Sequence, residues 1–257
     1  MPIASPRDVT PTTAPRRSPR REATRQRLLA AAEDVFAERG FHGASVEDIC
    51  ERADFTRGAF YSNFASRDEL VLELYAQHAT RLRSAVAELA AQPGLSLDEL
   101  FEGVIAVWTG QPEQRRRWHL LISEFALHAL RDPGAREAYA DLQRTLRADL
   151  VSLVDQIADT HGLTPVVPTQ DVVRMITIVL QGGLGQHLLE PRAVPAGSLE
   201  REFLPLLVSA ATRPSTAPPA PGGGGGRAGR SGRSGRSGRS GGSGRSGGSA
   251  RSDRSGG

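Results

Sequence analysis

The stretch 45–64 limits the possible folds of this chain more than any other part of the sequence. Ser45 is a good N-cap residue, and Asp48 follows it at the spacing of a capping box, so a short helix is expected to begin here. The apolar positions of this helix share one face: Val46, Ile49, Cys50 and Ala53. Residues 54–55 are expected to form a tight turn, and Thr56 can cap a second helix. Two short capped helices joined by a turn are typical of a helix-turn-helix.

The second of these helices is expected to have two different faces. Phe60 and Phe64 lie four residues apart and should both point inward, whereas Arg57 and Tyr61 share an outward face rotated by about 100°. Small residues at 58–59 would let the helix backbone approach a surface closely. An Arg can pair with a guanine edge, an Ala can touch a thymine methyl group, and hydroxyl or amide groups suit phosphate oxygens. The sequence therefore predicts a recognition helix in a DNA major groove.

Basic residues at the starts of two flanking helices extend this predicted surface. Arg25 opens the first helix and Arg67 the fourth, where each is expected either to meet a DNA phosphate or to be an ordinary exposed charge. Residues 23–70 hold six Arg and nine acidic residues, so affinity for DNA must depend on placement rather than on net charge. The residues expected to contact DNA are Arg25, Ser45, Thr56, Arg57, Gly58, Ala59, Tyr61, Asn63 and Arg67.

Four segments closely resemble the DNA-binding domain of tetracycline-repressor (TetR) family regulators. They are residues 24–32, 36–41, 45–64 and 66–70. The resemblance is rich in motifs over residues 24–75 and mostly architectural beyond them. It implies an all-α homodimer whose N-terminal domain binds an operator in double-stranded DNA and whose larger C-terminal domain binds a small effector that releases the DNA. One departure is Asn63, where many members carry His; Asn keeps a donor for phosphate but cannot titrate.

The charge of the chain is distributed unevenly between its ends and its centre. Residues 222–257 hold eight Arg and one Asp, and residues 1–22 hold five Arg and two acidic residues, whereas residues 23–221 hold 19 Arg and 26 acidic residues. Pro, Gly and Ser dominate both ends, which have too few apolar residues to fold. Both tails are therefore expected to be disordered and to add sequence-independent attraction to nucleic acid.

Cysteine content and hydropathy suggest a cytoplasmic protein. Cys50 is the single cysteine, which excludes an internal disulfide and favours a reducing compartment. It lies on an apolar stripe, so a small buried side chain is expected, with a redox sensor as the alternative. No uninterrupted apolar run reaches 18 residues, and no apolar segment follows the N-terminal Arg residues. Neither a transmembrane helix nor a secretory signal is expected, and no membrane partner.

Helix caps and chain breaks divide the sequence into four parts. These are a disordered basic tail (1–21), a helix-turn-helix DNA-binding domain (22–70), a helical ligand-binding and dimerisation domain (71–212) and a disordered Gly/Arg/Ser-rich tail (213–257). Besides the two helices above, we expect helices at about 23–39, 66–91, 96–109, 113–130, 134–160, 170–190 and 198–211. The expected caps of four of them are Ser66, Ser96, Thr169 and Ser198. No segment alternates with period two, so no strands are expected, and the predicted fold class is all-α.

The C-terminal part is expected to hold an effector pocket and a dimer interface. The candidate pocket residues, each with core or surface packing as the alternative, are Trp108, Trp118, His119, Glu124, Phe125 and His128. Glycines within a helix cost about 1 kcal/mol each relative to Ala, so the Gly-rich stretch 181–189 must serve close helix approach or leave room for a ligand. In the family resembled, the dimer seam lies here, and the expected interface residues are Gly182, Gly183, Gly185, Leu188 and Leu189.

These patterns predict a transcriptional regulator and not an enzyme. No G-x-S-x-G elbow, P-loop or zinc-ligand spacing occurs, so no catalytic residue, metal or cofactor is expected. The leading interpretation is a repressor released from a palindromic operator by a small, largely apolar effector. Two alternatives stay open: a nucleic-acid-binding protein that acts mainly through its basic tails, or a helical small-molecule-binding protein with a degenerate DNA-binding domain.

Overall fold

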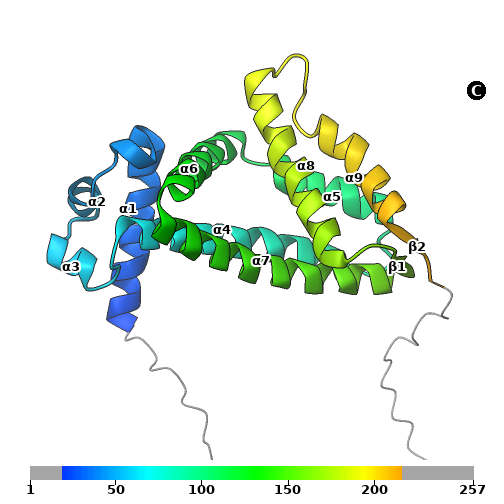
Figure 1. Ribbon diagram of the computed structural model, residues 1–257, viewed down its shortest axis with the longest axis horizontal. Helices are drawn as coiled ribbons and strands as arrows, with labels where there is room; N and C mark the ends of the chain where they lie inside the picture. Colours follow the sequence, from blue (N-terminus) through cyan, green and yellow to red (C-terminus); the bar gives the residue numbers. More distant parts are fainter. Residues whose placement is uncertain (1–18, 216–257) are drawn as a thin grey trace, which may run out of the picture. The chain divides into compact units, whose positions relative to one another are not determined.

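The computed structural model describes residues 19–215, which fold into nine α-helices and two short strands (Figure 1). In chain order the elements are α1 (Pro19–Gly43), α2 (Val46–Ala53), α3 (Arg57–Tyr61), α4 (Arg67–Ala90), α5 (Leu97–Thr109), α6 (Pro112–Arg131), α7 (Pro133–Thr160), β1 (Leu163–Pro165), α8 (Thr169–Leu189), α9 (Ser198–Ala211) and β2 (Thr212–Pro214). The all-α fold class is confirmed. The two predicted tails lie almost entirely outside the described residues.

The first three helices and the start of α4 pack around one apolar core. We call this part, residues 19–75, the head and residues 76–215 the body. Leu28 and Phe36 of α1, Ile49 of α2 and Phe60 of α3 are all buried in this core. The core also takes in Leu121 and Phe125 of α6, so the head and the body are packed together by apolar contacts.

The helix ends of the head follow the predicted caps closely. The Ser45 hydroxyl accepts the Asp48 N–H, and the Asp48 carboxylate in turn accepts the Ser45 N–H, completing the capping box. Gly40 interrupts α1 with a φ of 70°, a left-handed conformation that glycine adopts without a Cβ penalty. The first helix is therefore broken where the sequence predicts its end, and a further helical turn follows the kink as far as Gly43.

Three predictions about helix ends and strands were wrong. Thr169 and Ser198 are the first residues of α8 and α9, and neither side chain makes a capping hydrogen bond. The Thr169 hydroxyl instead donates to Asp155 Oδ1 of α7 at 2.7 Å. Two strands exist where none was expected: β1 and β2 pair antiparallel, with Thr164 opposite Arg213. At three residues each they are too short to show a period-two pattern in the sequence.

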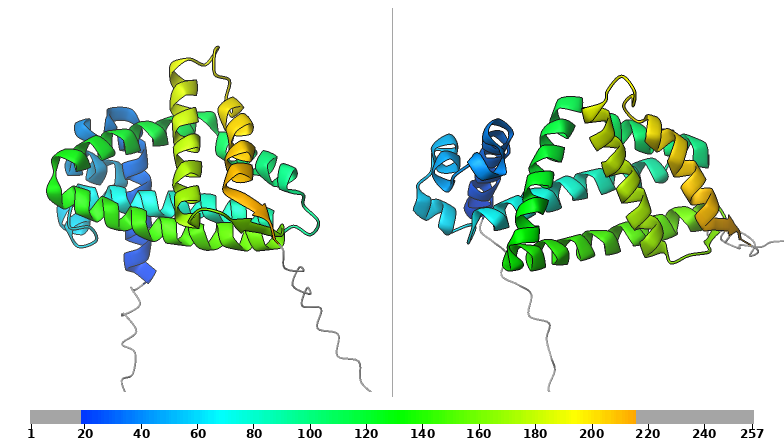
Figure 2. Two further views of the ribbon diagram at one scale, coloured as in Figure 1. Left: turned by 45° about the vertical axis from the view of Figure 1, so that its right-hand side comes forward. Right: turned by 45° about the horizontal axis from the view of Figure 1, so that its top comes forward.

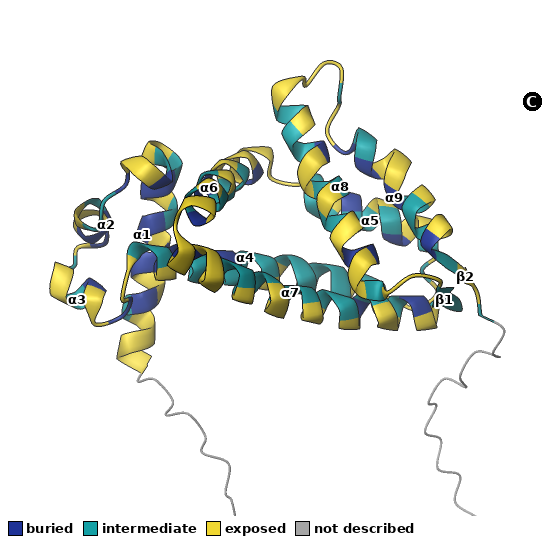
Figure 3. Ribbon diagram, viewed as in Figure 1, coloured by how far each residue is buried: buried dark blue, intermediate teal, exposed yellow. Residues whose placement is uncertain are grey.

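The body is built from long helices that lie across one another. Figures 1 and 2 show α4 and α7 running side by side. The helices α8 and α9 form a second pair, in which α8 packs against α7. The helix α5 packs against α4 and α9. In Figure 3 the fully buried positions gather in the head, whereas the body helices are mostly half-buried or exposed. All four fully buried residues of α4, for example, lie in its first nine positions, up to Tyr75.

Among the described helices, α8 alone is long and apolar enough to cross a membrane by length and composition. The sequence pattern did not single this helix out, because its apolar residues are interrupted by polar ones and by glycines. In the fold α8 packs against α7 and α9, yet only 17% of its most apolar window is buried. One apolar face of this helix is therefore left without a partner within the described chain.

Candidate DNA-binding surface and effector cavity

The turn between α2 and α3 sets the recognition helix at a defined angle. Asp54 ends α2 in the left-handed conformation, with a φ of 56°, and its N–H donates to backbone carbonyls of the last turn of α2. Thr56 Oγ1 then accepts the Ala59 N–H at 3.2 Å and starts α3. Phe60 and Phe64 are fully buried, as predicted, and anchor the inner side of α3 in the head core.

The outer side of α3 presents the predicted Arg57 and Tyr61 to solvent. Tyr61 is 49% exposed, and the Arg57 guanidinium lies 5.9 Å from the centre of its ring. Arg57 also pairs with Glu47 of α2 at 2.7 Å, and both partners are more than half exposed. An exposed ion pair of this kind contributes less than about 1 kcal/mol, so the guanidinium can exchange Glu47 for another partner. Gly58 beside it is exposed, and Ala59 is half-buried.

Arg25 is placed differently from the prediction. Its side chain is not at the surface but 2% exposed, with the guanidinium 4.2 Å from the centre of the Phe64 ring. It donates to the Asn63 carbonyl at 2.5 Å and lies 3.3 Å from Glu73 Oε2. Arg25 therefore ties α1 to the end of the helix-turn-helix and to α4. A phosphate contact would require this arrangement to break.

Three further residues predicted to contact DNA instead form hydrogen bonds within the head. The Ser45 hydroxyl donates to Asp48 Oδ2 at 2.7 Å, besides its role as a cap. Asn63 is buried, and its amide nitrogen donates to the Ala59 carbonyl at 2.8 Å. Arg67 donates to the Ala44 carbonyl at 2.5 Å and lies over the Phe41 ring. Of the nine residues predicted to contact DNA, five stay on the outer surface of α3 and its cap: Thr56, Arg57, Gly58, Ala59 and Tyr61.

Sequence reasoning missed a second arginine that holds the turn. Arg27 of α1 donates to the Ala53 carbonyl at 2.9 Å, and its guanidinium lies 4.5 Å from the centre of the Phe55 ring. The contact joins the middle of α1 to the α2–α3 turn. Nothing in the helical spacing of α1 separates this Arg from an ordinary solvent-facing one, because its partners lie 26 to 28 residues away.

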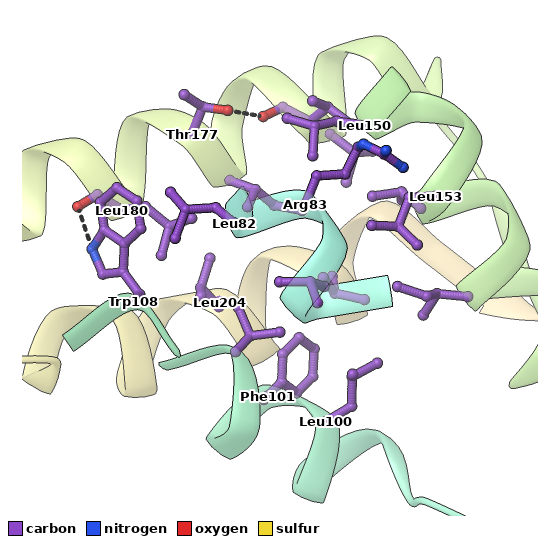
Figure 4. A pocket seen from close by; sticks show the side chains of 18 of the residues that line it. Leu82, Arg83, Leu100, Phe101, Trp108, Leu150, Leu153, Thr177, Leu180 and Leu204 are labelled. Carbon is purple, nitrogen blue, oxygen red and sulfur yellow. Dashed lines mark hydrogen bonds between the residues drawn. The ribbon is translucent and has the colours of Figure 1, made fainter. Parts of the chain in front are cut away.

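An apolar cavity of about 270 Å³ lies between the body helices (Figure 4). Side chains from α4, α5, α6, α7, α8 and α9 contribute to its walls, among them Leu82, Phe101, Leu153, Leu180 and Leu204. The polar groups around it are mostly satisfied by the chain itself. The Trp108 indole N–H donates to the Leu180 carbonyl at 3.1 Å, and the Thr177 hydroxyl donates to the Val173 carbonyl at 2.8 Å. The walls are therefore suited to a largely apolar ligand.

Only two of the six predicted pocket residues line this cavity, Trp108 and Trp118. The prediction missed its main walls, because the residues of α4 and α8 read in the sequence as ordinary buried helix faces. Leu82 and Val86 of α4, for example, have the spacing of a buried helix face but line the cavity.

Three other predicted pocket residues join the head to the body. Glu124 Oε2 accepts the Phe41 N–H at 2.6 Å. Phe125 is fully buried and packs edge-on against Phe41, with ring centres 5.3 Å apart. His128 Nε2 lies 2.9 Å from Asp68 Oδ2 at the start of α4. All three are on α6, the helix that also carries Trp118 at the cavity, so α6 touches both the cavity and the head.

The three glycines of α8 face three different surroundings. A Cβ atom on Gly183 would lie 2.6 Å from Glu200 Oε1, because the carboxylate of α9 packs directly onto this glycine. A Cβ on Gly185 would lie 3.5 Å from His119 Nε2 of α6, whereas one on Gly182 would meet nothing within 4 Å. The prediction that Gly183 contacts a second subunit was wrong, because this position is filled by a helix of the same chain.

His119 accordingly packs near Gly185 and does not line the cavity, contrary to the prediction. Leu188 is half-buried and Leu189 is 78% exposed, and their place in a dimer interface stays a prediction. Cys50 is buried, and burial raises the pKa of its thiol, which agrees with the small apolar role expected for it.

Comparison with known proteins matches both halves of the fold. A family model described as "Bacterial regulatory proteins, tetR family" matches residues 28–74, and one described as "BetI-type transcriptional repressor, C-terminal" matches residues 98–204. Together they cover more than half of the chain.

Individual relatives agree with this result. The chain is 35% identical over 82 residues to the HTH-type transcriptional regulator YdgC of Bacillus subtilis, covering 32% of this chain and 42% of that protein. It is 26% identical over 195 residues to the HTH-type transcriptional repressor AcnR of Corynebacterium efficiens, covering 74% and 94%. The solved structure of Salmonella enterica GusR superposes with a TM-score of 0.57 at 26% identity, covering 73% and 96%. From the helix-turn-helix, the helical body and these matches, we conclude that the chain belongs to the TetR family of DNA-binding transcriptional regulators.

Proposed function

We propose that the protein is a cytoplasmic, homodimeric repressor that binds a near-palindromic operator through α3 and is released by a largely apolar effector bound in the body cavity. The observation that carries the proposal is α6, which has Trp118 at the cavity wall and Glu124 and His128 against the head. A ligand that moves α6 would move the head with it. Effector and DNA affinity would then be coupled, and the coupling is reciprocal.

The outer surface of α3 supports the DNA-binding part of the proposal. Arg57 and Tyr61 are exposed on one side of a helix whose other side is anchored by Phe60, and Gly58 leaves room for a close backbone approach. In a dimer the two recognition helices would enter successive major grooves about 34 Å apart. Each Arg57 would pair with a base edge, and Tyr61 with a phosphate.

The experiment begins with selection of a binding site from a random duplex library, followed by a gel-shift titration on the selected site. A short palindrome should be enriched. Arg57→Ala should then weaken binding about tenfold or more, since one base contact contributes about 1–3 kcal/mol per half-site. The matched control is Arg52→Ala, which removes an equal charge from a side chain paired with Glu38 of α1 and should bind nearly as the wild type does. Enrichment of no palindrome, or equal losses in both variants, would contradict the proposal.

The unpartnered face of α8 and α9 supports the dimer. Met175, Ile178 and Leu189 of α8 are exposed, together with Phe203 and Leu206 of α9. On α8 they repeat at helical spacing along one side, which also includes the open Gly182. Contiguous exposed apolar side chains of this size mark interaction surfaces, and two such helices from each copy would bury one another.

Sedimentation of single variants at micromolar concentration tests the dimer. Ile178→Asp places a charge in the middle of the proposed interface and should shift the protein towards monomer, because an unpaired buried charge is costly. Val166→Asp is the control, since Val166 is similarly exposed but lies before α8. A dimer unaffected by Ile178→Asp would place the interface elsewhere.

A further inference from the structure

The cavity has an uneven charge. Within the described residues no Asp or Glu lines it, whereas one arginine, Arg83 of α4, does. The rest of the lining is apolar apart from His78, Tyr75, Gln181 and a few threonines. A cation among apolar walls is stabilised by an anionic partner, because a charge removed from water without one is costly.

Arg83 has no such partner in the described part of the chain. It is half-buried, and among residues 19–215 it forms no ion pair and no side-chain hydrogen bond. Figure 4 shows Arg83 leaving α4, and it shares the cavity lining with the apolar side chains of Leu150 and Leu153 on α7. Arg81, two residues earlier on the same helix, is exposed to water and does not line the cavity.

A second arginine lies near the cavity but does not line it. Arg115 of α6 is buried with its guanidinium 4.4 Å from the Trp108 ring centre, and its Nη1 has no hydrogen-bond partner within the described residues. His78 lines the cavity, and its buried Nε2 also lacks a partner there. Burial, together with Arg115 and Arg81, lowers the pKa of His78 to about 4, so this ring is neutral at neutral pH. His78 therefore adds no charge of its own to the cavity wall at neutral pH.

We propose that the effector is a hydrophobic monocarboxylic acid, whose apolar part fills the cavity and whose carboxylate pairs with Arg83. The inference rests on the proposed function, because it names the ligand class of the same cavity. A single guanidinium presents a planar pair of N–H groups that matches one carboxylate. A neutral ligand of the same shape would enclose Arg83 without a counter-charge. A ligand with several charges would leave most of them against apolar walls.

Two probes of matched length test the charge requirement. Decanoate and 1-decanol are titrated against the full-length dimer loaded with the neutral fluorophore N-phenyl-1-naphthylamine, and displacement is followed by fluorescence. The variants are Arg83→Gln, which removes the charge, and Arg83→Lys, which keeps it. Arg81→Gln is the matched control on the exposed side of α4. Gel shifts of all four proteins without probe report DNA binding separately.

The expected result is that decanoate displaces the fluorophore from the wild type about tenfold or more better than decanol does, since a charge-assisted hydrogen bond contributes about 1.5–3 kcal/mol. Arg83→Gln should remove this preference without changing decanol displacement. Arg83→Lys should keep most of the preference, and Arg81→Gln all of it. Equal displacement by acid and alcohol in the wild type, or an equal loss for both in Arg83→Gln, would overturn the inference. Intact operator binding in the same proteins would leave the proposed function standing, whereas its absence would count against that function itself.

Discussion

The head and the body use apolar residues in opposite ways. In the head, α1, α2 and α3 bury theirs against one another, and Leu28, Phe41, Ile49 and Phe60 have no exposed surface. In the body, the 28 residues of α7 include only three that are buried, and exposed apolar side chains run along α8 and α9.

The difference shows which apolar surfaces of each part are covered by the chain itself and which are not. The head core is filled by its own side chains together with Leu121 and Phe125 of α6, as expected of a rigid element that must hold a recognition helix in place. Within residues 76–215 the body has an unfilled region inside, the cavity, and an uncovered apolar surface outside, the face of α8 and α9. On the proposed function a ligand and a second copy would fill these two regions, and the body would respond to both, because anything that binds the folded state shifts its stability.

The largest effect should come from the contact that joins the two parts. Phe125→Ala removes a fully buried ring that packs against Phe41 and Tyr139, and should lower the free energy of unfolding by about 3–5 kcal/mol. Leu127→Ala, at a half-exposed site two residues along α6, is the control and should change little. Urea denaturation followed by circular dichroism measures both. An unaltered midpoint for Phe125→Ala would show that the head and the body are stabilised independently.

A smaller effect is expected inside the head, where two arginines can be compared. Arg25→Gln should cost about 1.5–3 kcal/mol of stability, because the charged hydrogen bond to the Asn63 carbonyl and the contact with Glu73 are lost. Arg57→Gln should leave the midpoint of urea unfolding nearly unchanged, since its pair with Glu47 is exposed. If Arg25→Gln instead kept full stability and lost DNA affinity alone, Arg25 would belong to the DNA-contacting surface after all.

Two neighbouring glycines of α8 should respond with opposite signs. Gly183→Ala brings a Cβ within 2.6 Å of the Glu200 carboxylate and should lower stability by about 1–3 kcal/mol through overpacking. Gly182→Ala adds a methyl group to open space within the described chain and should raise helix stability by up to about 1 kcal/mol. Thermal unfolding at one protein concentration compares them. A loss at Gly182 that accompanies dissociation would place that position in the dimer interface.

The smallest effect should be the pH dependence of stability that His78 of the body causes. The pKa of His78 is lowered to about 4 by burial and nearby Arg115, against its ordinary 6.5, so the unfolded chain takes up a proton before the folded one does. Stability should be greatest above pH 6.5 and fall towards pH 4. Between pH 7 and pH 5 the free energy of unfolding should fall by about 1 kcal/mol more in the wild type than in His78→Gln, after allowance for the partial exposure of the ring. His42→Gln, at an exposed site of the head, is the control. If the stability of the wild type and of His78→Gln changed with pH in parallel, the lowered pKa would not belong to His78.

Sequence reasoning worked well where the signals are local. Ser45, Asp48 and Thr56 cap their helices as predicted, and Phe60 and Phe64 point inward, because each of these features depends on residues three or four positions away. It was less successful where the partner is distant in the chain. Arg25 looks like any basic residue at a helix start, and its Asn63 partner lies 38 residues away.

The cavity was the hardest feature to foresee for a related reason. Leu82 and Val86 have the spacing of a buried helix face, and the sequence does not distinguish a face that meets another helix from one that faces a hollow. The same holds for Gly183, since the small residue was correctly seen as a sign of close approach. The identity of the approaching group, Glu200 of the same chain, required the fold.

The bend at Gly40 predicts where substitutions that disrupt the response to the effector will be found. A side chain at this position would be strained by the φ of 70° and would also meet the Glu124 carboxylate, with the Cβ only 2.8 Å from Oε2. The same carboxylate accepts the Phe41 N–H, so one glycine and one glutamate form a joint between α1 and α6. In a screen for alleles that still silence a reporter but ignore the inducer, we expect substitutions to accumulate at Gly40 and Glu124, although neither residue lines the cavity or the outer surface of α3.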